Sequence, residues 1–149
     1  EENKPLGTAG SLKFIDQNND SEHVLVHNSD IITDIDYKDL VSKHIKLKNK
    51  ITIAIKNQEV KIKHGIIKKS KTSIISEKPT ISYKIISGIY VIEKKTISEL
   101  IKKNEYLDMN KFIDKAYRNN KKIGFYDEQF FWLDIGTKDD LDLARSYFE

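Results

Sequence analysis

The sequence predicts an α/β fold in which a mixed, mostly parallel sheet is covered by helices on both faces. Strand patterns and helix patterns alternate along most of its 149 residues. Short, continuously apolar runs, such as 24–26 and 51–55, are typical of strands buried on both faces. Capping residues precede the runs whose apolar side chains have helical spacing. We expect one domain over residues 1–149, with no interdomain linker.

The amino-acid composition limits which partners the protein is expected to bind. Lysine and arginine number 26 against 23 acidic residues, and the charges are interleaved, so the net charge of +3 requires neither nucleic acid nor a membrane. Only Arg118 and Arg145 could make bidentate contacts to phosphates or guanines. The absence of cysteine excludes disulfides and thiolate metal sites and fits a cytoplasmic protein. No apolar run approaches the roughly 18–20 residues that span a bilayer.

The first half of the chain predicts two strands and two helices. A glycine-rich stretch at 7–10 precedes apolar residues at 12–15, which indicates a loop that enters a helix. Run 24–26 is followed by polar residues at the position where open α/β sheets bind ligands. Asp36 can cap a helix over the following residues, and run 51–55 restores a strand.

The middle of the chain predicts a small β-rich insertion and then a central strand. Between residues 60 and 76, short alternating pieces indicate exposed antiparallel strands. Residues 84–92 are apolar enough for a central strand, in which Gly88 marks a bulge or a close approach of another group.

The last third predicts three helices and two strands. We expect a capping box at 96–99, a cap from Asp108, strands at 122–126 and 129–133, and a cap from Thr137 on a final helix that buries Leu141, Ala144 and Phe148.

Two carboxylates stand at the ends of predicted strands. Asp30 follows run 24–26, and Asp134 lies between an apolar run and Gly136. Such carboxylates could hold Mg²⁺ and a substrate phosphate. The alternative is that both serve only in Asx turns or helix entries.

Other polar residues also allow two interpretations. In Glu77-Lys78-Pro79, the lysine could bind a phosphate and the glutamate could accept hydrogen bonds from hydroxyls, or the two could form an exposed ion pair. The four histidines share no ligand spacing. We expect them to be structural or solvated, with His27 and His44 neutral in or near the core.

Five short motifs, taken in order, resemble those of the sugar-1-phosphate nucleotidyltransferases. They are Pro5–Leu12, Val26–Ile31, Glu77–Pro79, Ser87–Tyr90 and Trp132–Thr137. The form of the first motif is similar to the mannose-1-phosphate guanylyltransferase branch and its small heptose- and hexosamine-phosphate relatives. The resemblance implies a Rossmann-like fold for the chain.

The resemblance also implies a role for each motif. The base would be lined by Leu6, Gly7 and Thr8. Asp30 would bind Mg²⁺ and the nucleotide, and Asp134 would complete the metal site. In the sugar 1-phosphate site, Glu77 would hold the sugar hydroxyls, Lys78 would hold the phosphate, and the Gly88 backbone would pack beside the sugar. Asp30, Lys78 and Asp134 would be the catalytic residues.

In this family a sugar-1-phosphate oxygen attacks the α-phosphorus of a nucleoside triphosphate, here GTP by preference, and pyrophosphate leaves. Such a reaction needs positioning and charge neutralisation more than it needs an acid or a base.

Family members begin with a strand and a Gly-x-Gly-Thr-Arg loop that grips the triphosphate, and neither occurs here. We therefore expect the carboxyl-terminal part of a nucleotidyltransferase domain, lacking its N-terminal strands. We expect it to be inactive alone and to associate with the missing segment or with a second copy. A non-catalytic nucleotide- or sugar-sensing module is the alternative. A generic interaction domain would instead keep Glu77, Lys78 and Gly88 out of the cleft of Asp134.

Overall fold

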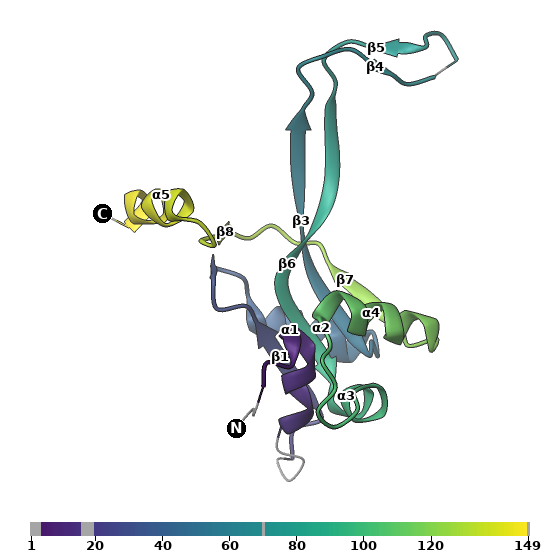
Figure 1. Cartoon of the computed structure of the whole chain (residues 1–149), viewed down its shortest axis with the longest axis vertical. Coiled ribbons are helices and arrows are strands. Elements are labelled where there is room, and N and C mark those ends of the chain that lie inside the picture. Colours follow the sequence, from purple (N-terminus) through teal and green to yellow (C-terminus); the bar gives the residue numbers. More distant parts are fainter. Residues whose placement is uncertain (1–3, 16–19, 70, 149) are drawn as a thin grey trace.

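A four-stranded mixed sheet forms the centre of the protein (Figure 1). The computed structural model describes residues 4–15, 20–69 and 71–148. In the sheet, the strand order is β1 (His23–His27), β6 (Thr80–Glu93), β3 (Ile51–Lys61) and β7 (Ile123–Tyr126). β6 runs antiparallel to both β1 and β3, whereas β7 is parallel to β3. The predicted α/β class with a mixed central sheet is confirmed. Of the three strand pairings in the described sheet, only that of β3 with β7 is parallel, so parallel pairings are the minority there.

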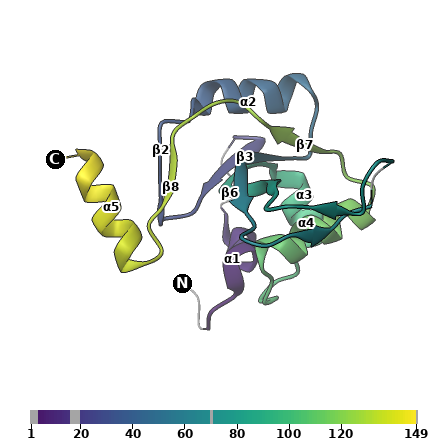
Figure 2. The ribbon, with the colours of Figure 1, turned by 90° about the horizontal axis from the view of Figure 1, so that it is seen from above.

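Helices cover both faces of this sheet (Figure 2). On one face lies α2 (Tyr37–Lys46), and on the other lie α3 (Lys94–Leu100) and α4 (Met109–Arg118). The short helix α1 (Gly7–Gly10) and the 3-10 helix η1 (Ser11–Phe14) pack beside α4 and α3. Because side chains of a strand alternate between faces, two hydrophobic clusters form, one around Ile53, Tyr90 and Phe112 and the other around Leu40 and Val91.

The predicted helix caps are confirmed at two ends and wrong at two. The carboxylate of Asp36 accepts hydrogen bonds from Lys38 N (2.9 Å) and Asp39 N (3.0 Å) at the start of α2. Thr137 accepts from Asp140 N (3.2 Å) at the start of α5 (Lys138–Phe148).

The other two helices begin differently. α3 starts at Lys94, two residues before the predicted capping box, and Thr96 is buried inside it. At the start of α4 the side chain of Asp108 forms no capping hydrogen bond. Instead, Met109 N donates to Thr8 Oγ1 at 2.8 Å, across 101 residues of sequence. A tertiary contact therefore replaces the local cap.

A two-stranded ribbon and the last helix lie beside the sheet. The ribbon pairs β2 (Ile31–Thr33) with β8 (Trp132–Asp134), antiparallel, and α5 contacts β8. β2 has three residues and was not predicted. In α5, Ala144 is buried as expected, whereas Leu141 is 37% exposed, so the prediction that it is buried was wrong. The side chain of Phe148 lies outside those described.

β3 and β6 continue past the sheet as a projecting hairpin, which we call the arm (residues 57–69 and 71–84; Figure 1). Their ladder extends from the pair Asn57–Lys84 to the pair Lys61–Thr80. At its tip, β4 (Ile66–Ile67) pairs with β5 (Ile75–Ser76), and the side chain of Ile67 is 90% exposed. The expected β-rich insertion is this arm.

The two histidines expected near the core differ. His44 is completely buried, with Nδ1 2.8 Å from Thr52 Oγ1 and Nε2 3.2 Å from His23 Nδ1. Burial, and then the charge of the neighbouring His23, lower the pKa of His44 to about 4, so the expected neutral form holds. His27 is exposed at the end of β1, and the expectation for it was wrong.

No helix in the described part of the chain has the length and apolar character needed to cross a bilayer. The outer strands of the described sheet, β1 and β7, carry the exposed apolar side chains Leu25 and Phe125. Association with another segment or a second copy remains a prediction.

Candidate functional site

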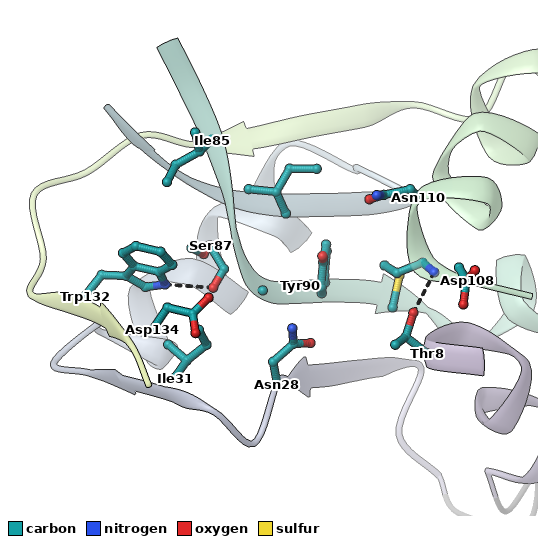
Figure 3. A pocket seen from close by; sticks show the side chains of 13 residues that line it. Thr8, Asn28, Ile31, Ile85, Ser87, Tyr90, Asp108, Asn110, Trp132 and Asp134 are labelled. Carbon is teal, nitrogen blue, oxygen red and sulfur yellow. Dashed lines mark hydrogen bonds between the residues drawn. The ribbon is translucent and has the colours of Figure 1, made fainter. Parts of the chain in front are cut away.

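A pocket of about 420 Å³ lies between the end of β1, the middle of β6, the ribbon strands β2 and β8, and the start of α4 (Figure 3). At one end of the view stand Trp132 and Asp134, and at the other stand Thr8 and Asp108, with Asn28 and Tyr90 between them. Segments from both ends of the chain thus meet at one pocket. Its described lining residues include two carboxylates and five amide or hydroxyl side chains, those of Thr8, Asn28, Ser87, Tyr90 and Asn110.

Gly88 forms the wall of the pocket at a bulge in β6. The ladder shifts register here, because Ile53 pairs with Tyr90 whereas Ile55 pairs with Ile86. Gly88 has φ of +80°, and a Cβ there would lie 2.9–3.2 Å from the side chain of Asn28. Both features require glycine. The bulge and the close approach predicted from the sequence are confirmed.

Hydrogen bonds fix the residues around this bulge. Ser87 Oγ donates to Ala54 O (2.8 Å), while Ser87 O accepts from the indole Nε1 of Trp132 (2.8 Å). Asn28 N donates to Gly88 O at 3.0 Å. Burial raises the pKa of Tyr90 above its usual value, so its hydroxyl stays protonated. The pocket wall is therefore tied to β1, β3 and β8.

The ribbon brings the main chains of the two predicted metal-binding residues together: Asp134 is the last residue of β8, and Asp30 immediately precedes β2. Ile31 pairs with Asp134, and Ile135 N donates to Asp30 O at 2.8 Å. Asp134 lines the pocket, and its Oδ1 accepts from Gly136 N (2.9 Å), so it also forms the Asx turn that was the alternative interpretation. Asp30 is exposed and its side chain lies outside the pocket lining.

The first motif reaches the pocket through one of its three predicted residues. Thr8 lines the pocket, and its hydroxyl is also the cap of α4. Leu6 is 2% exposed and belongs to the core, where its carbonyl accepts from Leu107 N (2.8 Å). The amides of Ala9 and Gly10 donate to Leu107 O, so these two are occupied within the protein.

Gly7 lies directly behind Asp108. It has φ of +75°, and a Cβ there would come within 2.8 Å of Asp108 Oδ1 and 2.7 Å of Leu107 O. The glycine therefore permits close packing of α1 against the segment that precedes α4.

Glu77 and Lys78 lie in the arm, away from the other predicted residues. They precede Thr80, and Thr80 is separated from Gly88 by roughly 25 Å of β-strand at about 3.3 Å per residue. Glu77 faces Gly65 near the arm tip. The structure therefore brings together Thr8, Gly88 and Asp134 but not Glu77 and Lys78, because the β3–β6 ladder continues and carries the third motif outward. Their assignment to the sugar phosphate remains a prediction.

Lys78 nevertheless has an unusual backbone. Its φ is +43°, a left-handed conformation that a lysine rarely adopts, and it precedes Pro79. Such conformations are frequent at ligand-binding positions.

Among the polar residues that line the pocket, Asn28, Tyr90, Asp108 and Asn110 were given no binding role from the sequence. Asn28 stood in the second motif, two residues before Asp30, so its position past a strand end was a usable signal. Asp108 was interpreted as a cap, and only the contact of Thr8 with Met109 reveals that its carboxylate is not used in that way.

The described residues contain no group of three or more histidine or acidic side chains that could hold a metal ion. A site built from two carboxylates is compatible with Mg²⁺, which usually binds one or two protein carboxylates and takes its other ligands from substrate phosphates and water. The assignment of Mg²⁺ to Asp30 and Asp134 remains a prediction, because the side chain of Asp134 lines the pocket whereas that of Asp30 does not.

Comparison with known proteins identifies the family to which the chain belongs. The model of the nucleotidyl transferase family matches residues 1–148. The chain therefore belongs to the nucleotidyl transferase family.

Two curated relatives are sugar-phosphate enzymes. The chain is 30% identical over 147 residues to D-glycero-alpha-D-manno-heptose 1-phosphate guanylyltransferase of Aneurinibacillus thermoaerophilus, covering 97% of this chain and 64% of the relative. It is 27% identical over 148 residues to mannose-1-phosphate guanyltransferase of Aspergillus oryzae, covering 93% of this chain and 40% of the relative. The chain thus spans about two fifths to two thirds of these relatives.

Solved structures share this fold. HddC from Yersinia pseudotuberculosis matches with a TM-score of 0.70 at 23% identity, covering 99% of this chain and 65% of that one, and it has also been crystallised with GMP-PN. The resemblance inferred from the five motifs is confirmed at the level of the family.

Proposed function

We propose that the protein transfers a nucleoside monophosphate from a nucleoside triphosphate, with GTP preferred, to a sugar 1-phosphate, releasing pyrophosphate. The observation that carries this proposal is the pocket in which Thr8, Gly88 and Asp134, from three separate motifs, lie together. The guanylyltransferase names of both curated relatives support the choice of GTP.

We place the base at the Thr8 end of the pocket and the phosphates at the Asp134 end. The sugar would lie beside the Gly88 backbone, which lines the middle of the pocket. The pocket wall is tied by the Ser87–Trp132 hydrogen bond, which keeps the reacting groups in one orientation.

Mg²⁺ would be held by Asp134 together with Asp30. When bound, the ion supplies positive charge that neutralises the phosphate oxygens. This is needed because the described lining of the pocket contains two carboxylates and no lysine or arginine.

Lys78 would supply a second positive charge to the sugar phosphate, with Glu77 accepting hydrogen bonds from sugar hydroxyls. Since both lie in the arm, this role requires the arm to bend toward the pocket when the substrate is present. The left-handed backbone of Lys78 supports a specific role for this residue.

The test is a screen of the full-length protein with Mg²⁺, the common nucleoside triphosphates and a panel of sugar 1-phosphates, in which pyrophosphate release is measured. We expect release with GTP and a mannose- or heptose-type sugar 1-phosphate. Release with no pair, in a sample that is folded by circular dichroism, would contradict the proposed reaction.

A second candidate function is a non-catalytic nucleotide- or sugar-sensing module. The hydrogen bond from Gly136 N to Asp134 Oδ1 favours it, because it gives Asp134 a structural task without a metal. Calorimetry separates the two: a sensor binds the nucleotide or sugar phosphate without releasing pyrophosphate, whereas the enzyme does both.

A further inference from the structure

We infer that Asp108 selects the base: its carboxylate accepts hydrogen bonds from the N1–H and N2–H groups of guanine. The inference rests on the proposed function, since it assigns base selectivity to one side chain of the same pocket. Nothing in the sequence motifs pointed to this residue as part of a binding site, because it stood at the start of a predicted helix.

The position of Asp108 is fixed from both sides. The preceding residue, Leu107, accepts from the amides of Ala9 (2.9 Å) and Gly10 (3.0 Å), and the following residue, Met109, donates to Thr8. Its own carbonyl accepts from Phe112 N at 2.9 Å. The main chain at Asp108 is thus attached to the motif that lies at the proposed base end of the pocket.

The carboxylate of Asp108 is available for a ligand. Thr8 provides the cap of α4, and the described structure has no capping hydrogen bond from the Asp108 side chain. The side chain is half-buried and lines the pocket together with Thr8 and Asn110 (Figure 3). Gly7 leaves open the space beside Oδ1 that a Cβ would enter.

The hydrogen-bonding pattern of a carboxylate matches one base. An ionised carboxylate only accepts, through two adjacent oxygens. Guanine presents two adjacent donors, N1–H and N2–H, on its Watson–Crick edge. Adenine and cytosine present a donor beside an acceptor, and uracil and thymine present one donor between two acceptors. The amide of Asn110 could donate to the guanine O6 beside these groups.

The test changes the hydrogen-bonding groups of the side chain at position 108 and those of the base together. Asp108→Asn replaces one acceptor by a donor, so it suits xanthine, which carries a carbonyl where guanine carries the N2 amino group. We expect kcat/KM for GTP to fall at least 10-fold and that for XTP to rise, so that the preference inverts. Asp114→Asn is the matched control, because Asp114 is an exposed aspartate of α4 outside the pocket lining.

A second test compares two nucleotides on the wild-type protein, so its result does not depend on whether a variant folds. The wild-type protein should bind ITP, which lacks the N2 amino group, about 10-fold more weakly than GTP in calorimetry. Equal affinity for the two nucleotides would overturn the inference, as would an unchanged base preference in Asp108→Asn.

Two further outcomes are distinguishable. If Asp108→Asn raises the KM for the sugar 1-phosphate while GTP and XTP keep their order, the carboxylate contacts the sugar and the inference is wrong, although the proposed function stands. If the wild-type protein binds no nucleotide at all, the proposed function fails together with the inference.

Discussion

The pocket and the arm carry motifs of the same family but position them by different means. Around the pocket, Gly88 is held by Asn28, by the Ser87 hydrogen bonds and by a hydrophobic cluster on each face of the sheet. In the arm, Glu77 and Lys78 are exposed, and the apolar side chains at the tip are exposed as well. The pocket residues are therefore placed by packing, whereas the arm residues are placed by two paired strands alone.

This difference indicates which part of the site is formed before substrate binds. A buried, hydrogen-bonded wall costs little to organise when a ligand arrives. A two-stranded hairpin without a core is only marginally stable by itself, so it is free to change position. We expect substitutions around the pocket to alter stability, activity or both, and substitutions in the arm to alter activity alone.

The largest effect is expected at Asp134. Asp134→Asn keeps an Oδ1 that can accept from Gly136 N but removes the charge, so the turn should persist while the proposed metal site is lost. In the full-length protein, we expect pyrophosphate release to fall by roughly 100-fold or more with little change in melting temperature. Retained activity would assign Asp134 to the turn only.

Acid should destabilise the folded protein through the buried side chain of His44. The pKa of buried His44 is lowered to about 4, first by burial and then by His23, with Lys50 adding to the shift and Glu93 opposing it. Since its folded pKa lies below its unfolded value of about 6.5, the unfolded chain binds the proton more tightly. The contribution of His44 to the free energy of unfolding should be fully present above pH 6.5. It should be lost as the pH decreases toward 4, which lowers the free energy of unfolding by up to about 3 kcal/mol.

Urea unfolding at several pH values checks this slope. His44→Gln should flatten it between pH 6.5 and 4, whereas His64→Gln, an exposed histidine of the arm, should leave it unchanged. An equal slope in wild type and His44→Gln would show that another group controls the acid response.

The local elements and the pocket wall could be predicted from the sequence because their causes are local. Asp36 and Thr137 cap their helices through residues two or three positions away. The glycine at 88 signals its bulge within the strand that contains it. Asp134 was identified because a carboxylate between an apolar run and a glycine is unusual.

What could not be predicted depends on contacts between distant segments. The cap of α4 comes from Thr8, so Asp108 was assigned a structural task that the fold gives to another residue. β2 is too short to show a periodic pattern, and its pairing with β8 is what brings Asp30 beside Asp134. The extent of the arm follows from a ladder in polar sequence at 57–61, where hydrophobic periodicity gives no signal.

Lys78 tests whether the arm takes part in the reaction. Lys78→Asn removes the cation but tolerates the left-handed backbone, so the fold should be preserved. A charge-assisted hydrogen bond contributes about 1.5–3 kcal/mol, so kcat/KM for the sugar 1-phosphate should fall roughly 10- to 100-fold. Lys71→Asn, at another arm lysine, should have no effect. If both variants behave like wild type, the arm is not part of the site.

Alanine substitutions at two glycines should distinguish the pocket from the arm by their effect on the free energy of unfolding. Gly88→Ala places a methyl group against Asn28 at φ of +80°, and we expect it to destabilise the protein by about 1–3 kcal/mol. Gly65→Ala in the arm would meet the flexible end of Glu77, and Ile75 Cγ2 at an ordinary contact distance of 3.7 Å, so its cost should stay within about 0.5 kcal/mol. Chemical denaturation measures both. Equal losses would mean that the arm is as tightly packed as the pocket wall.

The smallest effect is expected at the indole of Trp132. Trp132→Phe keeps most of the apolar ring but leaves the buried Ser87 carbonyl without the N–H group that donates to it at 2.8 Å. We expect a loss of about 1 kcal/mol in urea unfolding. Activity should fall more than this stability loss explains, because the same bond orients the residue before Gly88. Tyr83→Phe removes a polar group from an exposed aromatic side chain of the arm and should change neither quantity. If Trp132→Phe also changes neither, then the bulge is held by its backbone and by Asn28 without the ribbon.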